Sequence, residues 1–242
     1  MDPLSSFRGV EGRAGVLLDF DGTLSPIVAR PELARIRDGA RDAIARLVGR
    51  YAVVAIVSGR TGDQLRDLVG VDGVRLAALY GLADDAPVLP VELLDAVSAV
   101  VAPIQGTRVE PKGGSVAVHF RAAEEPLAAH EALVRLLTPI AAARGLELLP
   151  GKMVLELVPA GRPLKEGAVE RIVEEERLDA VLYAGDDVAD IRAFEALDRL
   201  AARGVHTLKV AVHGRETPVA LSDAADMVVD GPAGLVTLLR AL

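Results

Sequence analysis

The sequence predicts an α/β protein, a doubly wound (Rossmann-like) parallel core sheet into which an α+β cap domain is inserted. Short, continuously apolar segments alternate with amphipathic helical segments in both the N-terminal and the C-terminal parts of the chain. Between residues 87 and 159 the pattern changes to strands in which apolar and polar side chains alternate. We therefore expect a core domain formed by residues 1–86 and 160–242 and a cap domain formed by residues 87–159.

The N-terminal part of the chain contains the elements of a parallel sheet. Its predicted strands are Val16–Phe20, Val53–Val57 and Arg75–Tyr80, and continuous apolar segments of this kind are typical of strands buried on both faces. The helix between the first two strands carries one apolar stripe. Thr61 and Gln64 have the spacing of a capping box, which predicts the start of a second helix. This strand–helix–strand order implies right-handed crossovers.

The same order of elements returns after Pro163. The predicted helices and strands are Lys165–Arg177, Ala180–Ala184, Val188–Ala202, His206–Val212 and Met227–Val229. They can extend the sheet that the N-terminal strands begin.

The inserted segment has a different pattern. Apolar side chains alternate with others along residues 115–121 and 153–158, which is typical of antiparallel strands with one buried face. Two helical segments, Val91–Ile104 and Pro126–Arg144, can cover that face. The insert is therefore predicted to be an α+β domain with its own core.

Composition excludes several classes of function. The net charge of −8 argues against a nucleic-acid partner, because phosphate backbones need clustered Lys and Arg. The chain has no cysteine, which excludes a disulfide framework and a thiolate metal site. No apolar segment approaches the ~18 residues of a membrane span, and the N-terminus lacks a signal-peptide pattern. We expect a cytoplasmic monomer without a membrane partner.

The first group of candidate functional residues follows the first predicted strand, in the segment DFDGT at Asp19–Thr23. A strand period of two places Asp19 and Asp21 on the same side. Two carboxylates with open positions suit Mg²⁺, and without a cation they would be costly beside an apolar strand. Gly22 allows a sharp turn whose amides can face an anion. The alternative is a turn with solvated acids.

Two further candidates lie elsewhere in the predicted core, one after a strand and one at the start of a helix. Ser58, at the end of the second strand, can hold a phosphoryl oxygen, although Ser-Gly-Arg is also an ordinary turn and helix start. Lys165 begins a predicted helix, where its charge opposes the helix dipole, which indicates a function. Solvation at the surface is the alternative for Lys165.

A second acidic group, Gly185-Asp186-Asp187 with Asp190, follows the strand at Ala180–Ala184. It can complete a metal site, because open α/β sheets place their sites at the carboxyl ends of strands. Acids also suit the first turn of a helix, so capping is the alternative for Asp187 and Asp190.

The order and spacing of these four groups resemble the haloacid dehalogenase superfamily of phosphatases. The resemblance implies that Asp19 attacks phosphorus and becomes an aspartyl-phosphate, and that Asp21 is the general acid and base. It also implies that Ser58 and Lys165 neutralise the transferred group. Mg²⁺ would be held by Asp19, the backbone carbonyl of Asp21, and Asp186, with Asp190 bound directly, through water or outside the ligand shell. The other implied phosphate contacts are Gly22, Thr23, Gly59, Arg60 and Asp187.

The cap carries a narrower resemblance. Its segments EPKGGSVAVHFR at Glu110–Arg121 and GKMVLEL at Gly151–Leu157 are similar to those of trehalose-6-phosphate phosphatases. The implied reaction gives trehalose and phosphate from trehalose 6-phosphate, so the partner is a small phosphorylated sugar. Alternation of side chains supports a polar cap surface facing the metal. The implied sugar contacts are Lys112, His119, Arg121 and Glu156. A hairpin turn for Lys112 and solvated strand faces for the other three are the alternatives.

Three departures from that family question the substrate but not the chemistry. Ala189 and Ile191 stand where those enzymes usually have Thr and Glu, and the segment Leu79–Leu82 lacks their His. Aromatic residues are only 3% of the chain, so stacking on a sugar is not expected to dominate recognition. Other substrates that remain open are sucrose phosphate and a glycosyl-phosphoglycerate. Other classes are a phospho-accepting receiver-type module and a catalytically silent sugar-phosphate-binding subunit.

Overall fold

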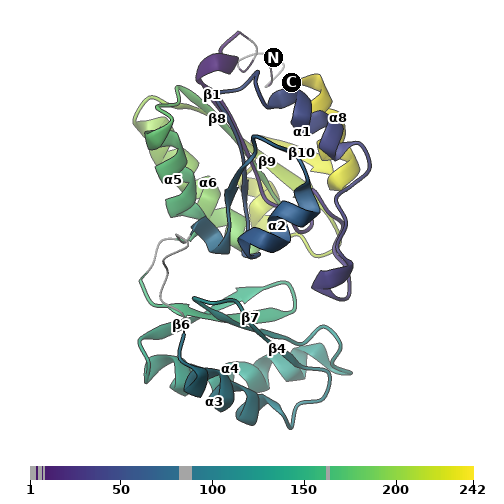
Figure 1. Cartoon of the computed structure of the whole chain (residues 1–242), viewed down its shortest axis with the longest axis vertical. Helices are drawn as coiled ribbons and strands as arrows, with labels where there is room; N and C mark the ends of the chain where they lie inside the picture. Colours follow the sequence, from purple (N-terminus) through teal and green to yellow (C-terminus); the bar gives the residue numbers. More distant parts are fainter. Residues whose placement is uncertain (1–3, 5–6, 8, 82–88, 162–163) are drawn as a thin grey trace. The chain divides into compact units, whose positions relative to one another are not determined.

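The computed structural model describes residues 4, 7, 9–81, 89–161 and 164–242. The chain divides into two compact units, which are described separately: Met1–Leu82 with Pro163–Leu242, and Ala83–Arg162. Both units are drawn in Figure 1. The predicted domain boundary between residues 86 and 87 lies outside the described residues, as do Leu82 and Pro163.

In the described part of the first unit, six parallel strands form a sheet in the order β10-β9-β8-β1-β2-β3. Leu18 of β1 lies between Ile56 of β2 and Ala184 of β8. The residues that follow these three central strands therefore meet at one edge of the sheet. The strands are β1 (Ala14–Leu18), β2 (Val53–Val57), β3 (Arg75–Ala77), β8 (Ala180–Gly185), β9 (His206–His213) and β10 (Met227–Asp230).

Helices cover both faces of this sheet (Figure 1). Along β1, Val16 and Leu18 pack into the core on one face and Leu17 into the core on the other, as strand alternation requires. The doubly wound α/β fold is thus confirmed. The first face packs against α1 (Ala40–Leu47), α2 (Gly62–Val69) and α8 (Gly231–Ala241). The second packs against α5 (Lys165–Glu175), α6 (Val188–Ala202) and α7 (Val219–Ala224).

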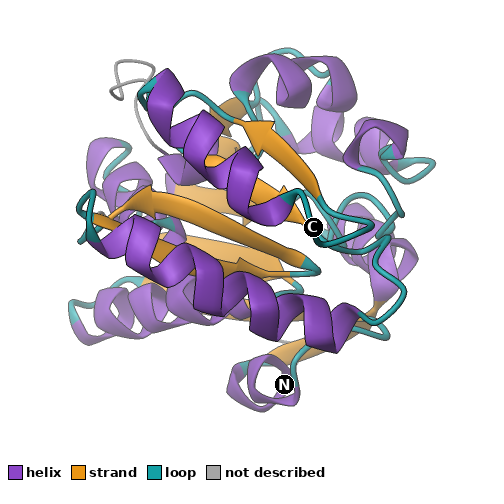
Figure 2. Ribbon diagram, turned by 90° about the horizontal axis from the view of Figure 1, so that it is seen from below, coloured by secondary structure: helices purple, strands orange, loops and turns teal. Residues whose placement is uncertain are grey.

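The second unit has its own antiparallel sheet, with described strands in the order β4-β5-β7-β6. Side chains such as Val118 and Leu155 pack against two helices, while Glu156 lies on the opposite face of the sheet. Figure 2 distinguishes the helices (purple) from the strands (orange). An antiparallel sheet packed against two helices confirms the predicted α+β class of the insert. The elements are α3 (Val91–Val101), β4 (Arg108–Pro111), β5 (Val116–His119), α4 (Pro126–Ala142), β6 (Leu146–Gly151) and β7 (Val154–Pro159).

The first predicted strand ends two residues too late. Strand β1 stops at Leu18, so Asp19 and Asp21 lie in the loop that follows it and their directions are not set by strand alternation. The backbone turns back on itself here, since the N–H groups of Leu24 and Ser25 both donate to the carbonyl of Phe20.

The predicted strand Arg75–Tyr80 is also too long. Strand β3 ends at Ala77, because Leu79 and Tyr80 adopt positive φ values of 49° and 60°. Their N–H groups donate to the carbonyls of Arg60 and Ser58 instead of continuing a strand ladder. Leu79–Gly81 form the short 3-10 helix η4. Two further 3-10 helices within the described ranges are η2 (Glu11–Arg13) and η3 (Pro31–Leu33).

In the cap, the alternating strand predicted along residues 115–121 ends earlier than expected, and Arg121 does not lie on it with His119. Strand β5 ends at His119, and Arg121 lies in the following turn, where its guanidinium donates to the Lys152 carbonyl at 3.2 Å. The sequence also did not indicate β4 and β6, which are the edge strands of the sheet and contain Pro111 and Pro150. Among the described residues, no helix is both long and apolar enough to cross a membrane.

Candidate active site

Three neighbouring strands deliver the predicted site residues to one edge of the core sheet. Asp19 follows β1, Ser58 follows β2 and Asp186 follows β8. The backbone N–H of Asp19 donates to the carbonyl of Ala184 at 2.9 Å, which joins the ends of β1 and β8. Groups far apart in the sequence therefore converge where a parallel sheet places its ligands.

A buried acidic cluster lies at this edge. Asp19, Asp186 and Asp190 each offer a carboxylate oxygen within 4.8 Å of the others, and each residue is at most 4% exposed. The ammonium of Lys165, the first residue of α5, donates to Oδ1 of Asp19 and to Oδ1 of Asp190, both at 2.7 Å. Two buried acids thus hold a lysine where a helix dipole disfavours positive charge.

Electrostatics at the cluster favour a further cation. Burial raises the pKa of Asp19 to about 7; attraction to Lys165 opposes this, while Asp190 adds to it. Burial also disfavours the charge of Lys165, but Asp19 and Asp190 outweigh that effect and raise the lysine pKa. Because Lys165 stays charged and still leaves Asp19 hard to ionise, more positive charge would stabilise the carboxylates. The oxygen donors of Asp19 and Asp186 fit Mg²⁺.

Asp190 has both a capping and a clustering role. Its Oδ2 accepts from the backbone N–H groups of Asp186 and Asp187, both at 2.9 Å, and Asp187 caps helix α6 by accepting from Val188 at 2.6 Å. Oδ1 of Asp190 accepts from the ammonium of Lys165 and from the hydroxyl of Tyr183, each at 2.7 Å. Sequence reasoning missed Tyr183, although it is the single aromatic in the aliphatic strand β8.

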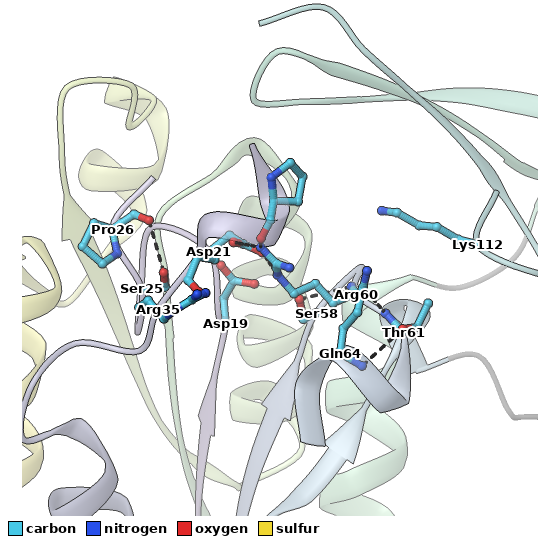
Figure 3. A network of polar contacts seen from close by, with 12 residues as sticks. Asp19, Asp21, Ser25, Pro26, Arg35, Ser58, Arg60, Thr61, Gln64 and Lys112 are labelled. Carbon is cyan, nitrogen blue, oxygen red and sulfur yellow. Dashed lines mark hydrogen bonds and ion pairs between the residues drawn. The ribbon is translucent and has the colours of Figure 1, made fainter. Parts of the chain in front are cut away.

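Asp21, two residues after Asp19, pairs with Arg60 (Figure 3). Arg60 donates from Nε to Oδ2 at 2.6 Å and from Nη2 to Oδ1 at 2.7 Å, a two-bond fork that fixes the carboxylate. The guanidinium also donates to the Pro31 carbonyl and lies over the ring of Phe20. The Arg60 side chain is buried and that of Asp21 is 38% exposed. The sequence did not indicate that Arg60, expected at the substrate, contacts Asp21.

The remaining core candidates have packing or hydrogen-bonding partners of their own. The buried hydroxyl of Ser58 accepts from the N–H of Arg60 at 3.3 Å, so the ordinary turn contact is present. The hydroxyl of Thr23 donates to Oδ1 of Asp186 at 3.3 Å. A Cβ atom at Gly59 would lie 2.5 Å from the hydroxyl oxygen of Tyr80, so a larger residue here would displace the tyrosine ring. The predicted capping box of Thr61 with Gln64 is confirmed (Figure 3).

The backbone at Gly22 lies close to the carboxylate of Asp186. Its φ is +86°, and a Cβ atom there would lie 1.8 Å from Oδ2 of Asp186. Only glycine combines this backbone conformation with room for the acid. The loop after β1 and the loop after β8 are therefore in direct contact.

In the second unit, the structure brings together two of the predicted sugar contacts. Glu156 is 2% exposed; it accepts from the Ser115 hydroxyl at 2.5 Å and lies 3.5 Å from the ammonium of Lys112. His119 instead lies 2.6 Å from a carboxylate oxygen of Glu110. The roles of Ser115 and Glu110 depend on pairing across the sheet, which the alternation of a single strand does not give.

Comparison with known proteins agrees with this arrangement. The profile of the trehalose-phosphatase family matches residues 17–226. A trehalose-phosphate phosphatase of Mycobacterium avium is 34% identical over 226 residues, 83% of this chain. The chain spans only 56% of that relative, and 15% of two relatives from Mycobacterium tuberculosis.

Solved structures share the fold. The C-terminal domain of a trehalose-6-phosphate phosphatase from C. albicans has a TM-score of 0.83 at 23% identity, covering 99% of this chain and 96% of that one. A phosphatase of the haloalkanoate (HAD) enzyme superfamily from Bacteroides thetaiotaomicron has a TM-score of 0.62 at 17% identity, covering 97% of this chain and 96% of that chain. With its sequence matched over residues 17–226 and its fold shared with these proteins, the chain belongs to the trehalose-phosphatase family.

Proposed function

We propose that this protein is a Mg²⁺-dependent phosphomonoester hydrolase that converts trehalose 6-phosphate to trehalose and phosphate through an aspartyl-phosphate at Asp19. The observation that carries the proposal is the Lys165 ammonium bound between Asp19 and Asp190 in a buried acidic cluster. Membership of the trehalose-phosphatase family supports the substrate.

Asp19 is the proposed nucleophile. Lys165 binds its Oδ1, so Oδ2 is the oxygen that we assign to bond formation with phosphorus. As that bond forms, the ester bond to the sugar oxygen breaks, and the leaving oxygen takes a proton from Asp21. Water then attacks the same phosphorus and loses a proton to Asp21, which releases phosphate and restores Asp19. This division into two displacements is the usual benefit of covalent catalysis.

Charge neutralisation is the main requirement of both steps, because an anionic carboxylate approaches an anionic phosphate. Lys165 and the Ser58 hydroxyl are the groups of the chain that we assign to the phosphoryl oxygens. Asp19, Asp186 and the backbone carbonyl of Asp21 would hold Mg²⁺, which when bound supplies further positive charge to the transferred group.

The Arg60 fork fixes the orientation of the Asp21 carboxylate, which is partly open to solvent, and Asp21 is the group that we assign to proton transfer. Asp21→Asn is expected to keep a burst of product with an activated aryl phosphate but to lose steady turnover of a sugar phosphate by about 10²-fold or more. An aryl oxide leaves without a proton, whereas the attacking water still needs a base. Rapid-quench kinetics on both esters measures this; equal losses in the burst and the steady state would assign Asp21 a structural role.

The proposed sugar contacts lie in the second unit. Glu156 is a buried carboxylate held by Ser115 and Lys112, on the sheet face away from the helices, and it can accept hydrogen bonds from sugar hydroxyls. We propose that Lys112 and His119 contribute to the same surface. The named relatives favour trehalose 6-phosphate over sucrose phosphate or a glycosyl-phosphoglycerate as the substrate that this surface receives.

Glu156→Ala is expected to lower kcat/KM for trehalose 6-phosphate by roughly 10–100-fold, the effect of losing one or two hydrogen bonds to a charged group. Turnover of p-nitrophenyl phosphate should change little, because it has no sugar. Glu147→Ala is the matched control, since Glu147 lies on the same sheet face, beside Val158. Equal losses of Glu156→Ala on both substrates would indicate damage to folding, and no loss on either would remove Glu156 from the substrate site.

A further inference from the structure

We propose that Tyr183 is a positioning residue for phosphoryl transfer, acting through Asp190 on the ammonium of Lys165. The inference rests on the proposed function, and it concerns a side chain that makes no contact with Asp19 or Asp186 among the hydrogen bonds of the described residues. Its basis is the set of four hydrogen bonds that converge on Asp190 from four different groups.

The carboxylate of Asp190 is saturated. Its two oxygens offer about four acceptor sites, and each oxygen accepts two hydrogen bonds. Oδ2 is used by the backbone of Asp186 and Asp187, and Oδ1 by Lys165 and Tyr183. A carboxylate in this state has no acceptor site left for a metal ion. Asp190 is thus assigned to orient its neighbours, with Asp19 and Asp186 left as the side-chain metal ligands.

Tyr183 is held rigidly enough to direct Asp190. Its ring is fully buried in the core on the α5 and α6 face, and it meets Phe194 of α6 edge-on, with ring centroids 6.3 Å apart. Its hydroxyl reaches Asp190 in the first turn of α6 at 2.7 Å. The strand β8 thereby fixes an acid on the helix that follows it.

The consequence falls on Lys165. Tyr183 and Lys165 donate to the same oxygen of Asp190, so the hydroxyl limits where that oxygen can lie and hence where the ammonium points. Without the hydroxyl, Oδ1 of Asp190 accepts from one donor instead of two. The carboxylate can then shift, and the ammonium of Lys165 can move with it away from the phosphoryl group. The Asp186 backbone binds the other oxygen, so the metal site should be affected much less.

The test compares Tyr183→Phe with Tyr51→Phe. Tyr51 is also buried, but it precedes β2, at the edge of the sheet opposite to Ser58, so its variant removes a buried hydroxyl far from the site. Four quantities are measured on the full chain: kcat in saturating Mg²⁺, the inhibition constant of orthovanadate as a mimic of the transferred group, Mg²⁺ affinity by calorimetry, and the melting temperature without metal. Phe194→Leu is the second variant, since it loosens the ring of Tyr183 but keeps its hydroxyl.

We expect Tyr183→Phe to lower kcat about 10-fold and to raise the inhibition constant of orthovanadate by a similar factor. Effects of this size are typical of a lost hydrogen bond to a charged group. The Mg²⁺ affinity of Tyr183→Phe should stay within about threefold of the unmodified protein, and Tyr51→Phe should keep kcat and vanadate inhibition near their original values. Phe194→Leu should lose less kcat and vanadate inhibition than Tyr183→Phe, because it loosens the ring but keeps the hydroxyl. Unchanged kcat and vanadate inhibition in Tyr183→Phe would overturn the proposal, as would equal losses in Tyr51→Phe. An unmodified protein that neither hydrolyses a phosphate ester nor binds vanadate would instead refute the proposed function.

Discussion

Replacing Asp19 by asparagine is expected to abolish turnover, with a loss of kcat of about 10³-fold or more, because an amide oxygen does not attack phosphorus. Asparagine has nearly the same shape, and Asp190 still holds Lys165, so the site should remain assembled. Phosphate release under single-turnover and steady-state conditions measures the effect.

Stability provides the control for this variant. Because burial raises the pKa of Asp19 to about 7, above its ordinary value of 3.8, its ionised form destabilises the metal-free protein as the pH rises through this interval. An amide has no such charge, so Asp19→Asn should melt no lower than the unmodified protein at pH 8 in EDTA. Ordinary turnover by a well-folded Asp19→Asn protein would refute the covalent mechanism.

The second large effect is expected at Gly22. In Gly22→Ala the new Cβ would lie 1.8 Å from Oδ2 of Asp186, so either the loop after β1 or the acid must move. A displacement of about 1 Å at reacting groups can lower kcat by about 10²-fold, and we expect at least that loss. Weaker Mg²⁺ binding should accompany it, which calorimetry would detect, because Asp186 is a proposed ligand.

Gly49→Ala is a closely matched control. Gly49 has a φ of +87°, against +86° at Gly22, but no atom of the described residues lies within 4 Å of the Cβ it would gain. Both variants should lose about 1–2 kcal/mol of stability from the positive φ, and only Gly22→Ala should lose Mg²⁺ affinity and turnover. Equal kinetic losses in the two variants would show that backbone strain, and not the contact with Asp186, is responsible.

Much of this site was predictable because the topology of a parallel sheet determines it. Continuous apolar segments predicted β2 at its observed bounds and β1 and β8 with small errors, and parallel strands bring Asp19, Ser58 and Asp186 to one edge. The unfavourable helix position of Lys165 indicated a function, and in the structure its ammonium binds Asp19 and Asp190.

Contacts set by loop conformation and by packing between elements were not predictable. The pairing of Asp21 with Arg60 depends on how two loops, 39 residues apart in sequence, turn toward each other. Tyr183 reaches Asp190 because β8 and α6 pack on one face, which periodicity does not specify. Strand alternation placed Glu156 on the correct face but did not reveal its burial beside Ser115 and Lys112.

The central claim is tested most directly by phosphate release from trehalose 6-phosphate, beside sucrose 6-phosphate and glucose 6-phosphate, with Mg²⁺ and with EDTA. The account predicts a kcat/KM for trehalose 6-phosphate at least about 10-fold above that for either other ester, a difference of about 1.4 kcal/mol in transition-state stabilisation, and no turnover in EDTA. Full activity in EDTA would contradict the metal-dependent mechanism. Preference for sucrose 6-phosphate, or no hydrolysis of trehalose 6-phosphate, would contradict the proposed substrate.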